Sequence, residues 1–408
     1  MITATSTTKK ISSNNFLIFI ICVMGMMSQF ATDSYIPSMP SMAEYFVVTA
    51  GAIKLTVGIY FLGMTSSILL FGYLSDKFGR KNILVLGYII FCISSLGCTF
   101  AQSEHQLLFF RFIQGIGMGS AFVSFRAIMS DVFIHGPSLA RASLIIGSVV
   151  SFIPPLAPIT GGIIQEFIGW RGNFGIHLML GSITILLIIK CLHLEDIPKH
   201  TDNIFRSYKN ILKNKSFVLN AVCGGLGLGL VFIFLTLSPF FFQVKMGFSP
   251  IQFSFISAGI ILPPAFFLII FKNQISKMDM DKVMVCCGSM TLASALVLAG
   301  SYFVVGVSPI AVVIFCALTF CANIFQFTAS YMSAYKYIRT QIGIASATYG
   351  FIQISMTMIF SILVSAVYLD TQIGLGLLMA IPPLLIIILK VVDIKFLSKK
   401  YSTNSNTN

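Results

Sequence analysis

Twelve apolar segments, each long enough to cross a lipid bilayer, follow one another along this chain of 408 residues. A membrane-spanning helix needs about 20 apolar residues in a row. Only 10% of the residues are charged, against about 25% in a soluble domain, so the sequence predicts an all-α integral membrane protein. We expect transmembrane helices near residues 16–37, 52–75, 83–102, 106–127, 138–166, 173–194, 216–243, 250–272, 283–304, 308–335, 343–368 and 371–396.

The basic residues gather on one side of these spans. The net charge of +13 would suggest nucleic acid as a partner for a soluble protein. Here, however, 22 of the 26 Lys and Arg residues fall in segments on the same side as the N-terminus, and only Lys54, Arg171 and Lys245 fall on the other. Cytoplasmic segments carry such an excess. We therefore expect a multi-pass protein of the bacterial inner (cytoplasmic) membrane, with both termini cytoplasmic and no nucleic-acid partner.

A polar connection near the middle divides the chain into two halves of six spans. We predict an N-terminal six-helix bundle at 1–194, a cytoplasmic linker loop at 195–215, a C-terminal six-helix bundle at 216–396 and a disordered cytoplasmic tail at 397–408. Two pseudo-symmetric bundles are typical of transporters that hold a small-molecule substrate near the bilayer midplane. The sequence has no Walker motif and no Cys/His spacing for a metal, so we expect no cofactor and a proton gradient as the source of energy. We also expect the protein to be a monomer.

Two charged residues, Asp33 and Arg111, fall well inside predicted spans. Each lies four or five residues from the outer end of its span, so their depths agree to within a helical turn. Ionisable residues inside a membrane mark substrate or proton pathways by default. We predict that the two form a proton- and substrate-coupling site, facing each other directly or through water. The alternatives are a static structural pair and an Asp33 that is solvated at the outer interface.

Other side chains are candidates for the lining of a substrate cavity. Gln114 follows the buried arginine by three residues on the same helix face, where it would bind a ligand or hold that arginine in place. Phe30, Tyr35 and Tyr60 are candidates for an aromatic wall, with lipid contact as the alternative for each. We interpret His177, inside the predicted sixth span, as a core histidine rather than a proton relay.

Three stretches are not generic membrane sequence: "GYLSDKFGRKN" at Gly72–Asn82, "RFIQGIGMG" at Arg111–Gly119 and "PPLAPITGG" at Pro154–Gly162. Together with "TDSYIPSMP" at residues 32–40, they resemble the major facilitator superfamily. More narrowly, they resemble its twelve-span drug/proton antiporters of the bicyclomycin and chloramphenicol resistance type. The resemblance covers the whole chain in layout, whereas the sharp motifs occur only in its first half.

By this resemblance, the first motif implies a latch that holds the inner side closed. Its residues are Gly72, Asp76, Gly79, Arg80 and Lys81. Gly72 would let two backbones approach closely. Asp76 would lie against the N-terminus of span eleven, near Gly343, where the helix dipole favours a carboxylate. Arg80 and Lys81 would pair with Asp76 or reach anionic headgroups.

The third motif predicts a kinked packing helix. Pro154, Pro155 and Pro158 interrupt the backbone hydrogen bonds of span five, and Gly161 and Gly162 permit close packing beside them. The resemblance places this helix at the interface of the halves and associates its motif with export.

These features favour proton-coupled export of a small, partly apolar molecule such as a drug by rocking of two bundles. The alternative within the same fold is transport of a specific metabolite such as a siderophore, in either direction. An integral-membrane enzyme would need clustered His, Asp or Glu near the spans. The five His residues are scattered, so the sequence disfavours an enzyme.

Overall fold

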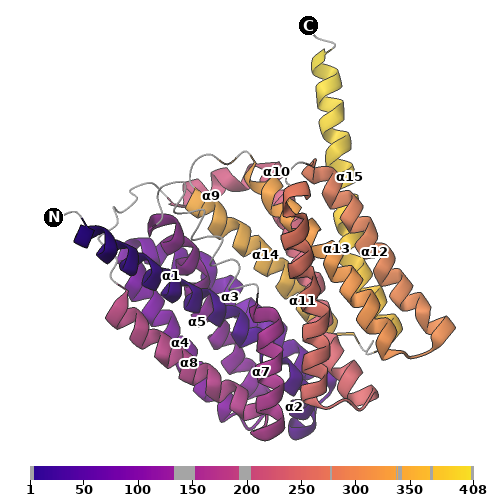
Figure 1. Ribbon diagram of the computed structural model, residues 1–408, viewed down its shortest axis with the longest axis horizontal. Coiled ribbons are helices and arrows are strands. Elements are labelled where there is room, and N and C mark those ends of the chain that lie inside the picture. Colours follow the sequence, from indigo (N-terminus) through magenta and orange to yellow (C-terminus); the bar gives the residue numbers. More distant parts are fainter. Residues whose placement is uncertain are drawn as a thin grey trace.

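The computed structural model describes residues 4–132, 152–192, 204–275, 278–336, 338, 342–367 and 371–405. All regular secondary structure within these ranges is helical, which confirms the predicted all-α class. Eleven helical segments there are long and apolar enough to cross a membrane. The predicted fifth span, 138–166, lies partly outside the described residues. Figure 1 shows two groups of helices side by side, one from each half of the chain.

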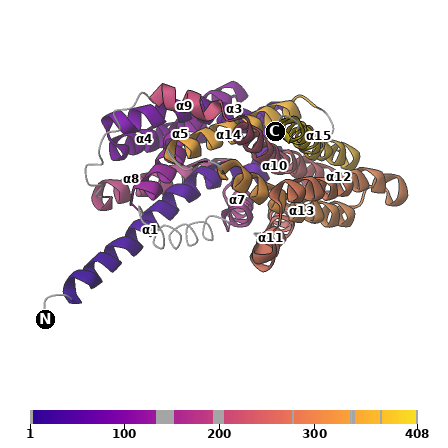
Figure 2. The same cartoon turned by 90° about the horizontal axis from the view of Figure 1, so that it is seen from above.

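The helices of the N-terminal half are α1 (Ala4–Asp33), η1 (Ile36–Ser38), α2 (Met39–Phe46), α3 (Ala50–Phe78), α4 (Arg80–Thr99), α5 (Glu104–Val132), α7 (Ile153–Phe167) and α8 (Trp170–Cys191). Those of the C-terminal half are α10 (Lys215–Pro239), η2 (Phe240–Lys245), α11 (Pro250–Ile275), α12 (Met280–Val305), α13 (Pro309–Tyr335), α14 (Ile342–Ser365) and α15 (Gln372–Ser405). A short helix, α9 (Ile204–Leu212), lies between the halves in the sequence; Figure 2 shows it near α3 and α4.

The first span is longer than the sequence predicts. It continues past residue 37, through η1 and α2, as far as Phe46. Pro37 and Pro40 do not end it because each lies in the first turn of a new helix, where the missing amide hydrogen costs nothing. Asp33 is therefore not near the outer end of its span. Its side chain is only 1% exposed, which contradicts the alternative of a solvated interfacial carboxylate.

The predicted linker loop and disordered tail both contain helix. Residues 204–212 of the linker form α9, and α10 begins at Lys215. Helix α15 continues to Ser405, where the sequence predicts a disordered tail from residue 397. Extending an existing helix costs far less than nucleating one, so a polar continuation of an apolar helix stays helical.

One end of the bundle carries a concentration of basic residues, and we call it the basic end. Lys77, Arg80 and Lys81 lie where α3 is followed by α4. Lys213 and Lys215 lie at the same end, where α9 is followed by α10. A tyrosine of α9 contacts α3 here, and this contact links the linker helix to the N-terminal half.

The two halves meet toward the opposite end, which we call the closed end. Gln243 Nε2 of η2 donates a hydrogen bond to the carbonyl oxygen of Pro37 at 2.9 Å. Closer to mid-depth, the rings of Phe61 and Phe232 meet edge to face at 4.7 Å. Gly162 of α7 packs against α11, where a Cβ would overlap the Ser254 hydroxyl and lie 2.8 Å from the carbonyl oxygen of Pro250. These contacts hold the halves together at the end opposite the basic end.

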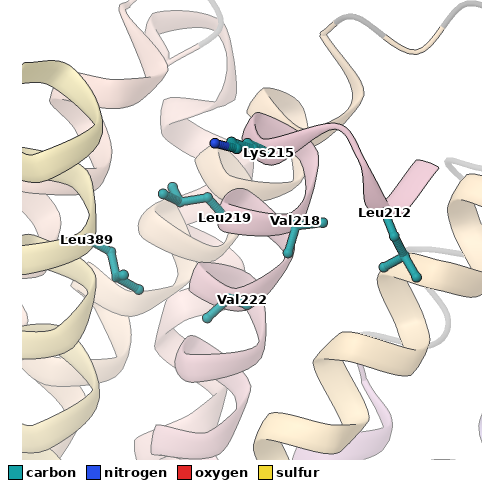
Figure 3. Close-up of a pocket in the computed structure, with 6 residues that line it drawn as sticks. All are labelled: Leu212, Lys215, Val218, Leu219, Val222 and Leu389. Carbon is teal, nitrogen blue, oxygen red and sulfur yellow. The ribbon is translucent and has the colours of Figure 1, made fainter. Parts of the chain in front are cut away.

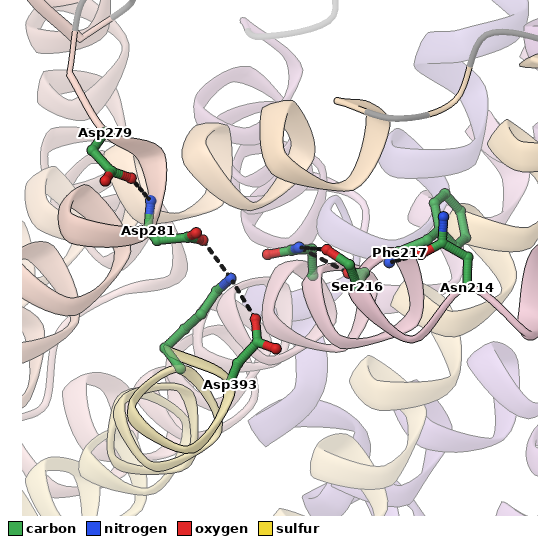
Figure 4. A network of polar contacts seen from close by, with 8 residues as sticks. Asn214, Ser216, Phe217, Asp279, Asp281 and Asp393 are labelled. Carbon is green, nitrogen blue, oxygen red and sulfur yellow. Dashed lines mark hydrogen bonds and ion pairs between the residues drawn. The ribbon is translucent and has the colours of Figure 1, made fainter. Parts of the chain in front are cut away.

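A buried lysine ties two helices of the C-terminal half, α12 and α15, together near the basic end (Figure 4). Lys390 of α15 is fully buried, and its Nζ lies 2.6 Å from Asp281 of α12 and 3.8 Å from Asp393. The amide of Asp281 is in turn bound by the side chain of Asp279, which caps α12. A buried ammonium is tolerated only when it is paired in this way.

We expect Gly162→Leu to open the closed end, because the larger side chain would force α7 away from the backbone of α11. The measurement is labelling of a reporter, Ser257→Cys, by a membrane-impermeant maleimide after replacement of the nine native cysteines. Ser257 is fully buried on α11. Gly175→Leu is the matched control, since nothing lies within 4 Å of a Cβ there. Equal labelling of the two variants would show that this contact does not hold the halves together.

Candidate coupling site in the N-terminal half

The site is built around a break in the first helix. Helix α1 ends at Asp33, and the chain turns through Ser34 and Tyr35 before η1 begins. The last carbonyl groups of a helix have no partner within it, so they are available to other donors. The carbonyl oxygen of Ala31 accepts a hydrogen bond from Arg111 at 3.3 Å, and that of Ser34 lies against Gly161 of α7, where a Cβ would overlap it.

Arg111 of α5 is fully buried and is held on several sides. Its Nη1 also donates to Gln114 Oε1 at 2.5 Å, and Gln114 Nε2 donates to Ser95 Oγ at 2.7 Å. The rings of Tyr35 and Tyr60 lie 4.3 Å each from the guanidinium carbon. Cation–π contact is strongest where water is excluded, as it is here. This contact is the one that the second predicted role of Gln114, holding the arginine in place, requires, and ligand binding by Gln114 stays a prediction.

The "RFIQGIGMG" motif explains how α5 brings this arginine so close to α3. A Cβ at Gly115 would overlap the carbonyl oxygen of Tyr60. Only a glycine permits the two backbones to touch at this point. Because Gly115 lies one helical turn after Arg111, the contact sets the depth at which the guanidinium meets the ring of Tyr60.

Asp33 lies beside this cluster without an ion pair to it. Neither carboxylate oxygen has a hydrogen-bond partner among the described residues, and the same is true of Arg111 Nε and Nη2. Of the two predicted arrangements, a direct contact is not present in this conformation. The structure therefore brings together a buried carboxyl and a buried guanidinium that each keep unused hydrogen-bonding atoms.

His177 of α8 is joined to the same break. Its Nε2 lies 2.7 Å from Ser34 Oγ, while its Nδ1 has no partner among the described residues. The imidazole is ringed by Phe30, Phe91 and Phe174 at centroid distances of 5.7–6.1 Å. Phe30, predicted as part of an aromatic wall around the substrate, contacts this histidine. Ser34, the hydrogen-bond partner of this histidine, directly follows Asp33 in the chain. No feature of the sequence indicates the contact between Ser34 and His177.

The structure describes the surroundings of three of the predicted latch residues, Gly72, Gly79 and Lys81. Gly72 faces Tyr208 and Val123 side chains, not the backbone that the sequence predicts. Gly79 has φ +91°, a conformation that favours glycine, and it separates α3 from Arg80 at the start of α4. Lys81 Nζ donates to the carbonyl oxygen of Ile189 at 2.9 Å, near the end of α8.

This contact of Lys81 differs from both predicted roles, pairing with Asp76 and contact with headgroups. A lysine is favourable at a helix C-terminus because of the helix dipole. The side chain of Asp76 lies outside the described part of the chain, so its predicted contact with span eleven stays a prediction.

The proline motif of span five begins a helix in the described part of the chain. Pro154 and Pro155 occupy the first turn of α7, and Pro158 lies inside it. The part of the predicted span before residue 152 lies outside the described residues, so the kink predicted at these prolines stays a prediction. Gly161, by contrast, meets the chain break at Ser34, and Gly162 meets α11, so this motif joins the site to the closed end.

Sequence reasoning missed two further buried cations. Lys54 of α3 is 1% exposed, with its Nζ 5.1 Å from the ring centre of Phe240 in the other half. Lys390 is the second, described above. Lys54 falls inside the predicted span 52–75 and Lys390 inside the predicted span 371–396. These positions within spans were the sequence signal that could have indicated buried side chains.

We expect Tyr60→Leu to lower protein stability more than Tyr60→Phe, by about 2 kcal/mol, the size of a desolvated cation–π contact. Phenylalanine keeps the ring over Arg111 and loses only the hydroxyl, which donates to the Ser28 carbonyl at a long 3.3 Å. Thermal unfolding of the purified variants in detergent measures the difference. If the two variants unfold at the same temperature, the ring does not stabilise the guanidinium.

Comparison with known proteins places this site in a family. The model of the major facilitator superfamily matches residues 21–360. The relatives include an uncharacterized MFS-type transporter, YdgK, of Bacillus subtilis, 29% identical over 58% of this chain and 61% of its own length. They also include a chloramphenicol resistance protein of Pseudomonas aeruginosa, 26% identical over 61% of this chain and 59% of its own length.

The multidrug resistance protein MdtL of Vibrio parahaemolyticus is 25% identical over 89% of this chain and 96% of its own length. The matches to the first two relatives thus span about three fifths of their length, whereas the match to the Vibrio protein is nearly complete. The crystal structure of a D-xylose-proton symporter shares the fold, with a TM-score of 0.72 at 13% identity over 91% of this chain and 96% of that one. The chain belongs to the major facilitator superfamily.

Proposed function

We propose that this protein is a proton-coupled antiporter that exports a small, partly apolar molecule, such as a drug, across the bacterial inner membrane. Relatives named for chloramphenicol and multidrug resistance support a drug-like substrate. The observation that carries the proposal is Asp33, a carboxyl buried inside a span with both oxygens free of hydrogen bonds among the described residues. A buried carboxyl of this kind is suited to binding and releasing a proton.

The orientation follows from the basic end. Because Lys and Arg are enriched in cytoplasmic segments, we assign the basic end and both termini to the cytoplasm and the closed end to the outside. The structure then corresponds to a state whose outer side is closed. A monomer suffices, since both bundles belong to one chain.

The cycle uses the two charges of the site in turn. Asp33 is buried, and the guanidinium of Arg111 donates a hydrogen bond to the carbonyl of Ala31, two residues before it. Asp33 is ionised when the site faces the cytoplasm and takes up substrate. It is protonated from the outside as substrate leaves. Movement of the bundles, which changes solvent access and the distance to Arg111, switches between these forms.

We expect Asp33→Asn to abolish transport driven by a pH gradient in proteoliposomes, because asparagine keeps the size of the side chain and cannot carry the proton. Substrate exchange without a gradient should persist, which shows that the variant is folded. Glu44→Gln is the control, a carboxylate on the exposed surface of α2. Proton-driven transport at the wild-type rate in Asp33→Asn would exclude the proton role.

We expect Arg111→Gln to move the pH profile of transport to higher pH, because the ionised form of Asp33 loses its nearby cation while burial remains. If the two share one site, the double variant Asp33→Asn, Arg111→Gln should lose little more activity than either single variant. Transport against pH for the four proteins measures both effects. An unshifted profile with additive losses would instead indicate that Arg111 binds an anionic substrate independently of Asp33.

A further inference from the structure

An apolar groove lies at the basic end, outside the coupling site (Figure 3). It has a volume of about 270 Å³ and is lined by Leu212, Lys215, Val218, Leu219, Val222 and Leu389. Its walls come from three elements: the end of α9, the first two turns of α10, and α15. Five of its six lining residues are aliphatic, and the sixth is a lysine.

The groove begins at the end of a membrane-spanning helix. Lys215 is the first residue of α10, and Val222 lies seven residues further on, about 10 Å along the helix axis. The headgroup region of one leaflet is about 5–8 Å thick, so a groove that starts at the helix end reaches into the hydrocarbon. With Lys215 placed at the headgroups, Val218, Leu219 and Val222 would lie progressively deeper, toward the acyl chains.

The mouth of the groove is basic. Lys209 in the last turn of α9, Lys213 in the turn that follows and Lys215 at the start of α10 are all exposed. Asn214 fixes this turn by accepting a hydrogen bond from the amide of Phe217 at 3.1 Å. Asp281 and Asp393 of the adjacent helices pair with Lys390, whose single charge meets two carboxylates.

We propose that this groove binds an anionic phospholipid of the leaflet at the basic end, with its phosphate on Lys215 and one acyl chain along the aliphatic wall. A lysine ammonium beside an aliphatic wall matches a ligand that carries both an anionic group and an apolar chain. A free phosphate would gain nothing from the wall. The volume falls below the range of about 300–1,000 Å³ typical of drug-sized ligands.

A lipid bound here would act on the linker between the halves. Helix α9 supplies Leu212 to the groove, and its Tyr208 packs against α3 of the N-terminal half, with its hydroxyl 3.1 Å from where a Cβ on Gly72 would lie. The lipid would thus fasten α9 to the C-terminal half. This proposal does not depend on proton coupling or on the direction of transport.

Tryptophan fluorescence tests the proposal, because the chain has a single tryptophan, Trp170, in α8 far along the sequence from the groove. In a Trp170→Phe background, Leu389→Trp places a reporter in the groove. Ile388→Trp places the matched control on the exposed side of the same helix, where the native side chain is 50% exposed. Each protein is reconstituted with acyl-brominated phosphatidylglycerol or phosphatidylcholine, whose bromines quench tryptophan on contact.

We expect phosphatidylglycerol to quench the groove reporter preferentially, and Lys215→Gln to reduce that preference about fivefold, the effect of one basic residue near an anionic lipid. Lys282→Gln, an exposed lysine at the start of α12, should leave the preference unchanged, and the Ile388→Trp reporter should show none. No preference at Leu389→Trp, or a preference that survives Lys215→Gln, would overturn the proposal. Loss of the preference on addition of millimolar inorganic phosphate would also overturn it, since the groove would then bind the anion alone.

Discussion

The guanidinium of Arg111 is the charge on which the organisation of the N-terminal half depends. Placing it inside a bilayer is costly unless its charge and its donors are met. The break in the first helix after Asp33 supplies an unused carbonyl oxygen at the helix end, where the dipole also favours a cation. Two tyrosine rings cover its faces and Nη1 also donates to Gln114, while Nε and Nη2 have no partner among the described residues. Helices α1, α3 and α5 are thereby fixed to one another.

The same break connects the site to the rest of the molecule. Ser34 binds His177 of α8, Gly161 of α7 packs against the Ser34 carbonyl, and Pro37 accepts a hydrogen bond from the C-terminal half. A change in the backbone conformation around Asp33 would therefore also change its contacts with α7, with α8 and with the interface between the halves. This arrangement gives a physical route by which protonation of one carboxyl would bias the movement of two bundles.

The pattern of the sequence was enough for the fold. Runs of apolar residues predicted the spans, whereas the distance of Asp33 from the end of its span was wrong, since that span continues to Phe46. Spacing along a single helix also placed Gln114 beside the arginine. It did not reveal that the first span extends to Phe46, because the prolines that suggest an end also start new helices. Nor did it reveal Lys54 as buried, since a lysine near a span end is usually solvated.

What the sequence determined by itself is the membrane, the helical class, the division into two halves and the rarity of charge inside the spans. These follow from local properties, since every backbone group in lipid must be satisfied within its own helix. The rotation of each helix about its axis was decided only by tertiary packing. That rotation depends on contacts such as Gly115 against Tyr60, which join residues far apart in the chain. For this reason the ring sandwich around Arg111, the histidine behind Ser34 and the groove beside Lys215 became visible only in the structure.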